Sequence, residues 1–191
     1  MRSRASAPPA GRSTPRHPKS CWWGARSASS SAAPISAGTP VPEFTLQRED
    51  GTEFTRADLE GKTTVLVFYP FAFSPVCTDQ IGLYEEVLSD YLVKRGATMY
   101  GVSCDARWSQ TAFREKLGVS IPQLSDFEPK GAACRAFGVY HPGGFPQRAL
   151  VIVGPDAVVG WSYQAPAVTD LPGANLIFDG LDATAAGSAR A

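Results

Sequence analysis

The chain has 191 residues, a length that predicts one domain with a tail or at most two small domains. Its hydrophobic content of 43% is enough for an ordinary core and excludes a wholly disordered or fibrous chain. The net charge is zero, but residues 1–40 hold six basic and no acidic residues, so the remainder is mildly acidic. No basic stripe of the kind that binds nucleic acid is present outside the tail. The longest apolar runs are far shorter than the roughly 20 residues that a membrane-spanning helix needs, so we expect no contact with a membrane.

The first 38 residues have the composition of a disordered tail, because Ser, Ala, Pro and Arg dominate and no helical or strand period is present. An Arg- and Ser-rich segment without acids is typical of an organellar transit peptide, but four prolines interrupt the amphipathic helix that such a peptide needs. A start codon assigned too far upstream gives the same bias, and we prefer this interpretation. Residues 39–185 are predicted to form the folded domain, and residues 186–191 a flexible C-terminus.

From residue 39 onward, strand and helix patterns alternate. The β-branched and aromatic run at 63–69 predicts a central strand buried on both faces, and apolar spacing over 77–95 predicts a helix that ends at Gly96. This order predicts an α/β fold in which a central mixed sheet is flanked by helices on both faces. Further strands are expected to begin near 41 and to cover 98–103, 123–124, 149–153 and 157–163, and further helices 109–117, 130–137 and 176–183.

The four cysteines, Cys21, Cys77, Cys104 and Cys134, are too few and too widely spaced for a disulfide framework. No Cys-x-x-Cys pair or Cys/His cluster is present, so we expect neither a metal site nor a metal cofactor. This pattern indicates a reducing compartment, and we expect the protein in the cytoplasm.

Cys77 falls at the start of the predicted helix 77–95. The unpaired backbone N–H groups and the positive end of the helix dipole there favour a thiolate, which is the nucleophilic form of cysteine. Ser74 lies three residues upstream in a loop bracketed by prolines, from which its hydroxyl could reach the sulfur and a bound substrate. Position alone leaves open that Cys77 is a small buried hydrophobic residue.

The pattern Pro-x-x-x-Ser-x-x-Cys over residues 70–77, placed after a hydrophobic strand, resembles the active-site signature of the peroxiredoxins. The resemblance extends over residues 39–183 and is strongest for the AhpE-type one-cysteine group. It implies a thioredoxin-like fold. The segments that carry it are Gly61-Lys62, Phe68-Tyr69-Pro70, Gly101-Val102-Ser103, Leu124-Ser125-Asp126-Phe127, Phe137-Gly138-Val139 and the run from Arg148 to Val153.

The resemblance also implies roles for individual residues. Cys77 matches the peroxidatic cysteine, Ser74 the hydroxyl that positions the peroxide, and Pro70 the proline that shields the sulfur. Arg148 matches the arginine that completes the pocket, although a strand-end surface arginine is its ordinary structural explanation. One position departs from the family: Gln80 stands where most members have Glu, and we expect its amide to accept a hydrogen bond from Arg148.

A peroxiredoxin reduces hydrogen peroxide or an alkyl hydroperoxide through a cysteine sulfenic acid, without a cofactor. The resemblance implies recycling by an external thiol reductant, either thioredoxin or a low-molecular-weight thiol with a glutaredoxin-like protein. It also implies a homodimer, with apolar contacts from Phe71, Phe73 and Phe145.

Three alternatives stay open at this stage. Cys104 or Cys134 could act as a resolving cysteine, although Cys104 closes a predicted strand and is expected to be buried, and Cys21 in the tail is a poor candidate. A thiol-disulfide oxidoreductase on the same fold would need a second cysteine three residues from Cys77. A redox sensor or holdase would use Cys77 without turnover.

Overall fold

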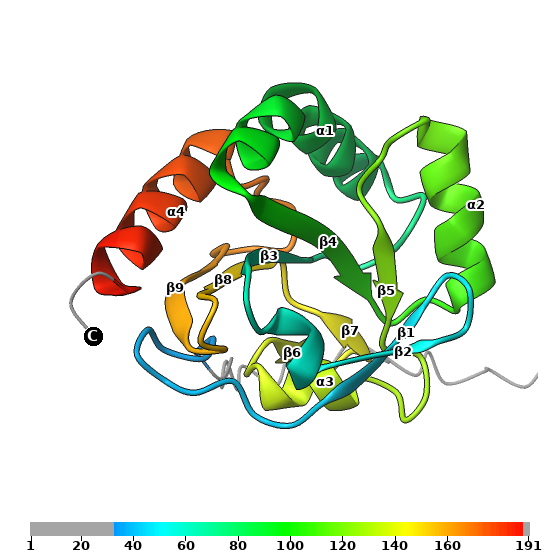
Figure 1. The fold of residues 1–191 in the computed structure, drawn as a ribbon. Helices are drawn as coiled ribbons and strands as arrows, with labels where there is room; N and C mark the ends of the chain where they lie inside the picture. Colours follow the sequence, from blue (N-terminus) through cyan, green and yellow to red (C-terminus); the bar gives the residue numbers. More distant parts are fainter. Residues whose placement is uncertain (1–32, 189–191) are drawn as a thin grey trace, which may run out of the picture. The chain divides into compact units, whose positions relative to one another are not determined.

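The computed structural model describes residues 33–188 (Figure 1). The predicted disorder of residues 1–32 and the predicted flexibility of residues 189–191 lie outside the described residues. In chain order, the elements are β1 (Thr45–Arg48), β2 (Glu53–Thr55), the 3-10 helix η1 (Arg56–Leu59), β3 (Thr63–Phe68), α1 (Pro75–Arg95), β4 (Ala97–Ser103), α2 (Arg107–Leu117), β5 (Gln123–Ser125), α3 (Ala132–Ala136), β6 (Tyr140–His141), β7 (Phe145–Pro146), β8 (Ala149–Val153), β9 (Val159–Gln164) and α4 (Ala174–Ser188).

The main sheet has seven strands in the order β2-β1-β5-β4-β3-β8-β9. β3 pairs parallel with β4 and antiparallel with β8, so the sheet is mixed as predicted. Five of the six residues of β3 are buried, because neighbouring strands cover both edges and side chains cover both faces. The predicted central strand is therefore confirmed.

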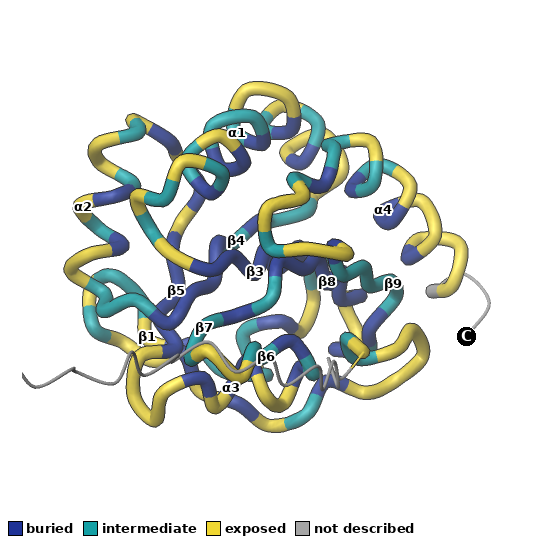
Figure 2. Tube along the Cα trace, turned by 180° about the vertical axis from the view of Figure 1, so that it is seen from behind, coloured by how far each residue is buried: buried dark blue, intermediate teal, exposed yellow. Residues whose placement is uncertain are grey.

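Alternate residues of β3 supply the two hydrophobic cores. Leu66 and Phe68 face the core beneath α3, while Val65 and Val67 face the core beneath α1 and α4. Figure 1 shows α1, α2 and α4 on one side of the sheet and α3 with the β6–β7 hairpin on the other. In Figure 2 the buried positions concentrate on the central strands. Helices thus flank both faces as predicted, and within residues 33–188 no helix has the length and apolarity needed to cross a membrane.

Several element boundaries differ from the prediction. α1 begins at Pro75 rather than 77, because proline is favoured at the first position of a helix. β1 begins at Thr45 rather than near 41, and α4 continues to Ser188 through residues predicted to be flexible. The two-residue strands β6 and β7 were not predicted, since segments this short carry no readable alternation.

Residues 33–38, which the sequence analysis assigned to the tail, contact the folded unit. The backbone N–H of Ile35 donates to the carbonyl of Phe137 at 2.9 Å, and that of Gly38 to the carbonyl of Val159 at 2.7 Å. Ile35 also packs on the core beneath α3. These contacts were not predicted, because a single apolar residue inside a polar, Pro-rich segment gives no periodic signal.

We predict that a chain beginning at residue 39 is less stable than one beginning at residue 33. The shorter chain loses the hydrogen bonds of Ile35 and Gly38 and the apolar contact of Ile35, which together contribute about 2–3 kcal/mol. Urea unfolding of the two chains measures the difference. Equal midpoints would show that residues 33–38 do not contribute to stability.

Candidate active site

Cys77 is the third residue of α1 and is fully buried. β3 leads into a short loop, Ser74 is the N-cap of the helix, and Pro75 is its first residue. The sulfur therefore belongs to the first helical turn, whose backbone N–H groups have no partners within the helix. This is the position that the sequence predicted.

The loop before α1 is fixed by two hydrogen bonds, one to β4 and one to Asp105, two residues after β4 ends. The backbone N–H of Tyr69 donates to the carbonyl of Val102 at 3.0 Å, and that of Ala72 donates to the carboxylate of Asp105 at 2.8 Å. Phe73 adopts a left-handed conformation, with a φ of 63°. Pro70 is buried at the end of β3. These contacts fix the loop that connects β3 to the first turn of α1, where Cys77 lies.

Arg148 lies one residue before β8 and is only 2% exposed. One Nη donates to Cys77 Sγ at 3.3 Å, the other Nη donates to Gln80 Oε1, and Nε donates to the carbonyl of Val168 at 2.9 Å. β8 pairs with β3, so the arginine approaches from the strand beside the one that carries the Cys77 loop. The expected hydrogen bond between Arg148 and Gln80 is present.

Arg148 has no carboxylate partner among residues 33–188, where all four ion pairs involve other residues. A buried guanidinium without a counter-charge is costly. The ionisable group in hydrogen-bond contact with it is the Cys77 thiol. The guanidinium thus contacts the Cys77 sulfur without a carboxylate between them in the described part of the chain.

Sequence reasoning missed the residue that holds Gln80. The Gln80 amide donates to the Tyr84 hydroxyl at 3.2 Å, and this hydroxyl donates to the carbonyl of Pro172 at 2.7 Å. An amide presents an acceptor on one side and a donor on the other, so the bond to Tyr84 directs the amide oxygen toward Arg148. Burial raises the pKa of Tyr84 to about 12 and keeps it a donor. Tyr84 is one of the residues whose apolar spacing predicts the helix, and that pattern gives it no polar role. Its position four residues after Gln80 was the available signal of a contact between the two side chains.

The Ser74 hydroxyl differs from the expectation that it faces the sulfur. It donates to the carbonyl of Phe71 at 3.1 Å, and within the described residues it has no hydrogen bond to Cys77. The reason is local, because a serine before a helix readily bonds to backbone groups of its own turn.

The two other cysteines of the described chain lie on the opposite side of the sheet. Cys77 belongs to the core beneath α1, whereas Cys104 and Cys134 belong to the core beneath α3. All three are free and buried. The contact with Cys104, together with burial, raises the pKa of Cys134 well above its ordinary value and keeps it a thiol.

Comparison with known proteins identifies the family. The model of the AhpC/TSA family matches residues 37–162. The chain belongs to this family. It is 33% identical over 106 residues to the putative peroxiredoxin Rv2521 of Mycobacterium tuberculosis, a match that covers 56% of this chain. It is 34% identical over 108 residues to the peroxiredoxin Bcp of Escherichia coli, a match that covers 56% of this chain and 67% of that protein.

The solved structure of Enterococcus faecalis AhpC superimposes with a TM-score of 0.70 at 25% sequence identity, and the match covers 79% of this chain and 93% of that chain. The predicted resemblance to the peroxiredoxins and the thioredoxin-like α/β fold are therefore confirmed, whereas the AhpE-type subgroup is not specified by these relatives. The match covers 66% of the Mycobacterium tuberculosis relative, slightly under two thirds of its length.

We predict that Tyr84→Phe lowers the free energy of unfolding by about 1–3 kcal/mol, because the Pro172 carbonyl and a Gln80 N–H lose their buried partner. Urea unfolding at pH 7 measures this loss. The gap to the wild type should narrow as the pH rises from about 10 to about 12, because the unfolded hydroxyl ionises before the folded one. In the control Tyr100→Phe, the hydroxyl removed has no hydrogen-bond partner among the described residues, so we expect little change. Equal losses in both variants would contradict the role of Tyr84.

Proposed function

We propose that this protein is a thiol peroxidase that reduces hydrogen peroxide and organic hydroperoxides through Cys77. The observation that carries the proposal is the buried contact of the Arg148 guanidinium with Cys77 Sγ at 3.3 Å. It lies at a helix N-terminus, and no carboxylate in the described part of the chain competes for the guanidinium. Relatives named peroxiredoxin and alkyl hydroperoxide reductase support the same activity. A thiolate held in this way is a nucleophile suited to an electrophilic oxygen.

In the proposed step, the Cys77 thiolate attacks one oxygen of the peroxide. A sulfur–oxygen bond forms, the oxygen–oxygen bond breaks, and cysteine is oxidised to sulfenic acid. The leaving oxygen departs as hydroxide or alkoxide and takes up a proton to become water or an alcohol. Arg148 donates hydrogen bonds toward the oxygens as negative charge moves onto them, an interaction that strengthens in the transition state.

Ser74 and Pro70 complete the proposed pocket. The Ser74 hydroxyl lies one helical turn from the sulfur, and rotation about its Cα–Cβ bond would exchange the Phe71 carbonyl for a peroxide oxygen. Pro70 is buried, and its backbone has no N–H group to bind water. In the proposed pocket its ring limits the access of water to the sulfur. Gln80 and Tyr84 act through Arg148 and are positioning residues.

The sulfenic acid is proposed to be reduced by an external thiol. Cys104 and Cys134 lie across the sheet from Cys77, so neither can reach it while the sheet is intact. A one-cysteine cycle with thioredoxin, or with a low-molecular-weight thiol and a glutaredoxin-like protein, fits this separation. The free thiols suit a reducing compartment, and the cytoplasm stays a prediction.

The homodimer also stays a prediction. Phe71 and Phe73 are 46% and 51% exposed beside the site, and Phe71 packs on Phe145 with ring centroids 4.9 Å apart. These rings give a second copy an apolar surface next to Cys77.

We predict that Cys77→Ser abolishes peroxide turnover, whereas Cys104→Ser and Cys134→Ser each retain it. Peroxide consumption with excess thiol reductant distinguishes an enzyme, which consumes many equivalents, from a sensor, which consumes about one. Peptide mapping after one equivalent of hydrogen peroxide should find sulfenic acid at Cys77. A stoichiometric disulfide from Cys77 to Cys104 or Cys134 would overturn the one-cysteine cycle.

We also predict that Arg148→Met slows peroxide reduction by about 100- to 1,000-fold, because it removes a donor to the breaking bond. Raising the pH should recover only the part of the loss due to a smaller thiolate fraction. Arg95→Met is a suitable control, since Arg95 is an exposed residue paired with Asp182. Complete recovery at high pH would reduce Arg148 to a residue that only ionises the thiol.

A further inference from the structure

A second cluster of chemically active side chains lies outside the proposed active site. Cys104, Asp126 and Cys134 bring their ligand atoms within 4.8 Å of one another, and their exposed fractions are 7%, 3% and 0%. We propose that this cluster is a binding site for a thiophilic divalent cation of the Zn²⁺ class. The proposal does not depend on the peroxidase activity, because the cluster lies on the other side of the sheet from Cys77.

The sheet register brings the first two ligands together. Ser103 at the end of β4 pairs with Ser125 at the end of β5, so the next residues, Cys104 and Asp126, leave the sheet side by side. The backbone N–H of Asp126 donates to the carbonyl of Ser103 at 2.9 Å and fixes this arrangement. These two ligands come from separate parts of the chain, so no sequence motif announces them.

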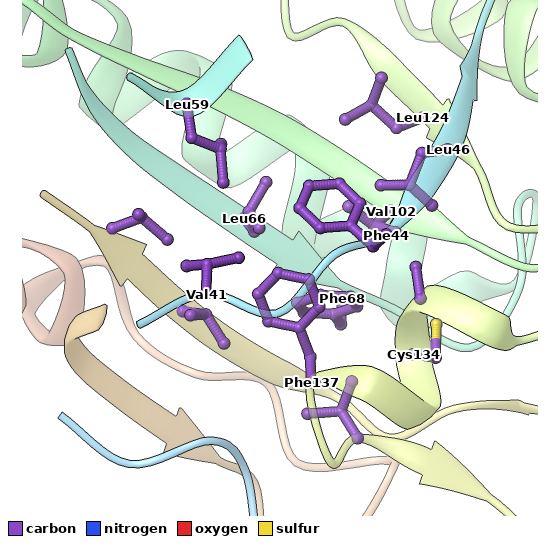
Figure 3. Packing of buried hydrophobic residues seen from close by; sticks show 14 of the residues in the cluster. Val41, Phe44, Leu46, Leu59, Leu66, Phe68, Val102, Leu124, Cys134 and Phe137 are labelled. Atoms are coloured by element: carbon purple, nitrogen blue, oxygen red, sulfur yellow. The ribbon is translucent and has the colours of Figure 1, made fainter. Parts of the chain in front are cut away.

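The third ligand comes from α3, which packs against the ends of β4 and β5 where Cys104 and Asp126 lie. Cys134 lies on this helix, and Figure 3 shows it among the buried residues of the hydrophobic cluster. The Asp126 carboxylate accepts the backbone N–H groups of Ala133 at 3.1 Å and of Cys134 at 2.8 Å. These bonds orient the carboxylate and use one lone pair on each oxygen, which leaves another for a cation.

The carboxylate is what favours a cation over a disulfide. Asp126 is buried, yet it has no ion pair among residues 33–188. A disulfide between Cys104 and Cys134 would leave this acid without a counter-charge, whereas a divalent ion would supply one. Both thiols are also buried away from oxidants, which makes them slow to react.

Two thiolates and one carboxylate form a donor set that Zn²⁺ accepts. In a tetrahedral site with Zn–S bonds of about 2.3 Å, neighbouring sulfurs lie about 3.8 Å apart, so small side-chain shifts would suffice. Binding would release the two thiol protons to solvent. Three protein ligands leave the fourth position to a water molecule or a small anion, and Cys104 offers the more exposed side.

The test uses the full chain in a Cys21→Ser/Cys77→Ser background, so that Cys104 and Cys134 are its only thiols. Co²⁺ is added under a phosphine reductant as a spectroscopic substitute for Zn²⁺. We expect one Co²⁺ per chain with thiolate-to-cobalt charge-transfer absorption, displacement by Zn²⁺ and a higher Tm with Zn²⁺. Absence of the absorption at stoichiometric Co²⁺ would overturn the proposal.

Single replacements in this background identify the ligands. Cys104→Ser and Cys134→Ser should each lose the absorption, and a band retained in both would overturn the site. Asp126→Asn keeps an acceptor for one of the two N–H groups of α3. Provided that its circular dichroism matches the parent, it should retain the absorption and bind Co²⁺ at least about tenfold more weakly. Unchanged affinity in Asp126→Asn would remove the carboxylate from the site.

Alkylation of the wild-type chain tests the site without any substitution that could prevent folding. In the wild-type chain, at a urea concentration chosen so that Cys104 and Cys134 are alkylated slowly without metal, Zn²⁺ should protect both thiols together, as counted by peptide mass. Equal labelling of both thiols with and without Zn²⁺ would contradict the proposal.

Discussion

The site depends on a buried positive charge that no carboxylate of residues 33–188 neutralises. Arg148 is held by Gln80, Val168 and Cys77, and the first two of these are neutral. Burying a guanidinium is costly unless its N–H groups are satisfied, and these three contacts supply acceptors for it. Gln80 bonds to the arginine as a neutral amide, whereas a glutamate in its place would put a negative charge beside the guanidinium.

The sheet explains why these groups meet. β3 carries the loop that leads to Cys77, β8 begins next to Arg148, and the two strands are hydrogen-bonded neighbours. The same β3 separates Cys77 from Cys104 and Cys134, because successive residues of a strand face opposite sides. One strand therefore both assembles the proposed peroxidatic site and isolates it from the other thiols of the described chain.

The sequence predicted what is encoded locally. The strand, the proline-bracketed loop and the helix start placed Cys77 in the first turn of a helix. The bond between Arg148 and Gln80, which joins distant parts of the chain, was expected only from the resemblance to the peroxiredoxins. The remainder depends on contacts between distant segments. In the sequence, Tyr84 looks like a core residue, and only the fold brings the Pro172 carbonyl to its hydroxyl. Cys104 and Asp126 are neighbours only because of the register between β4 and β5. The rotamer of Ser74 is likewise decided by competing acceptors that no pattern reveals.

The segment between β9 and α4 links the site to the end of the chain. The carbonyls of Val168 and Pro172 hold Arg148 and, through Tyr84, Gln80. Terminal helices open at a lower free energy than central strands. Fraying of α4 into this segment would therefore release the arginine while the sheet stays intact. Temperature and mild denaturant would then disrupt the contacts of Arg148 by a sub-global opening, below the midpoint at which the whole domain unfolds.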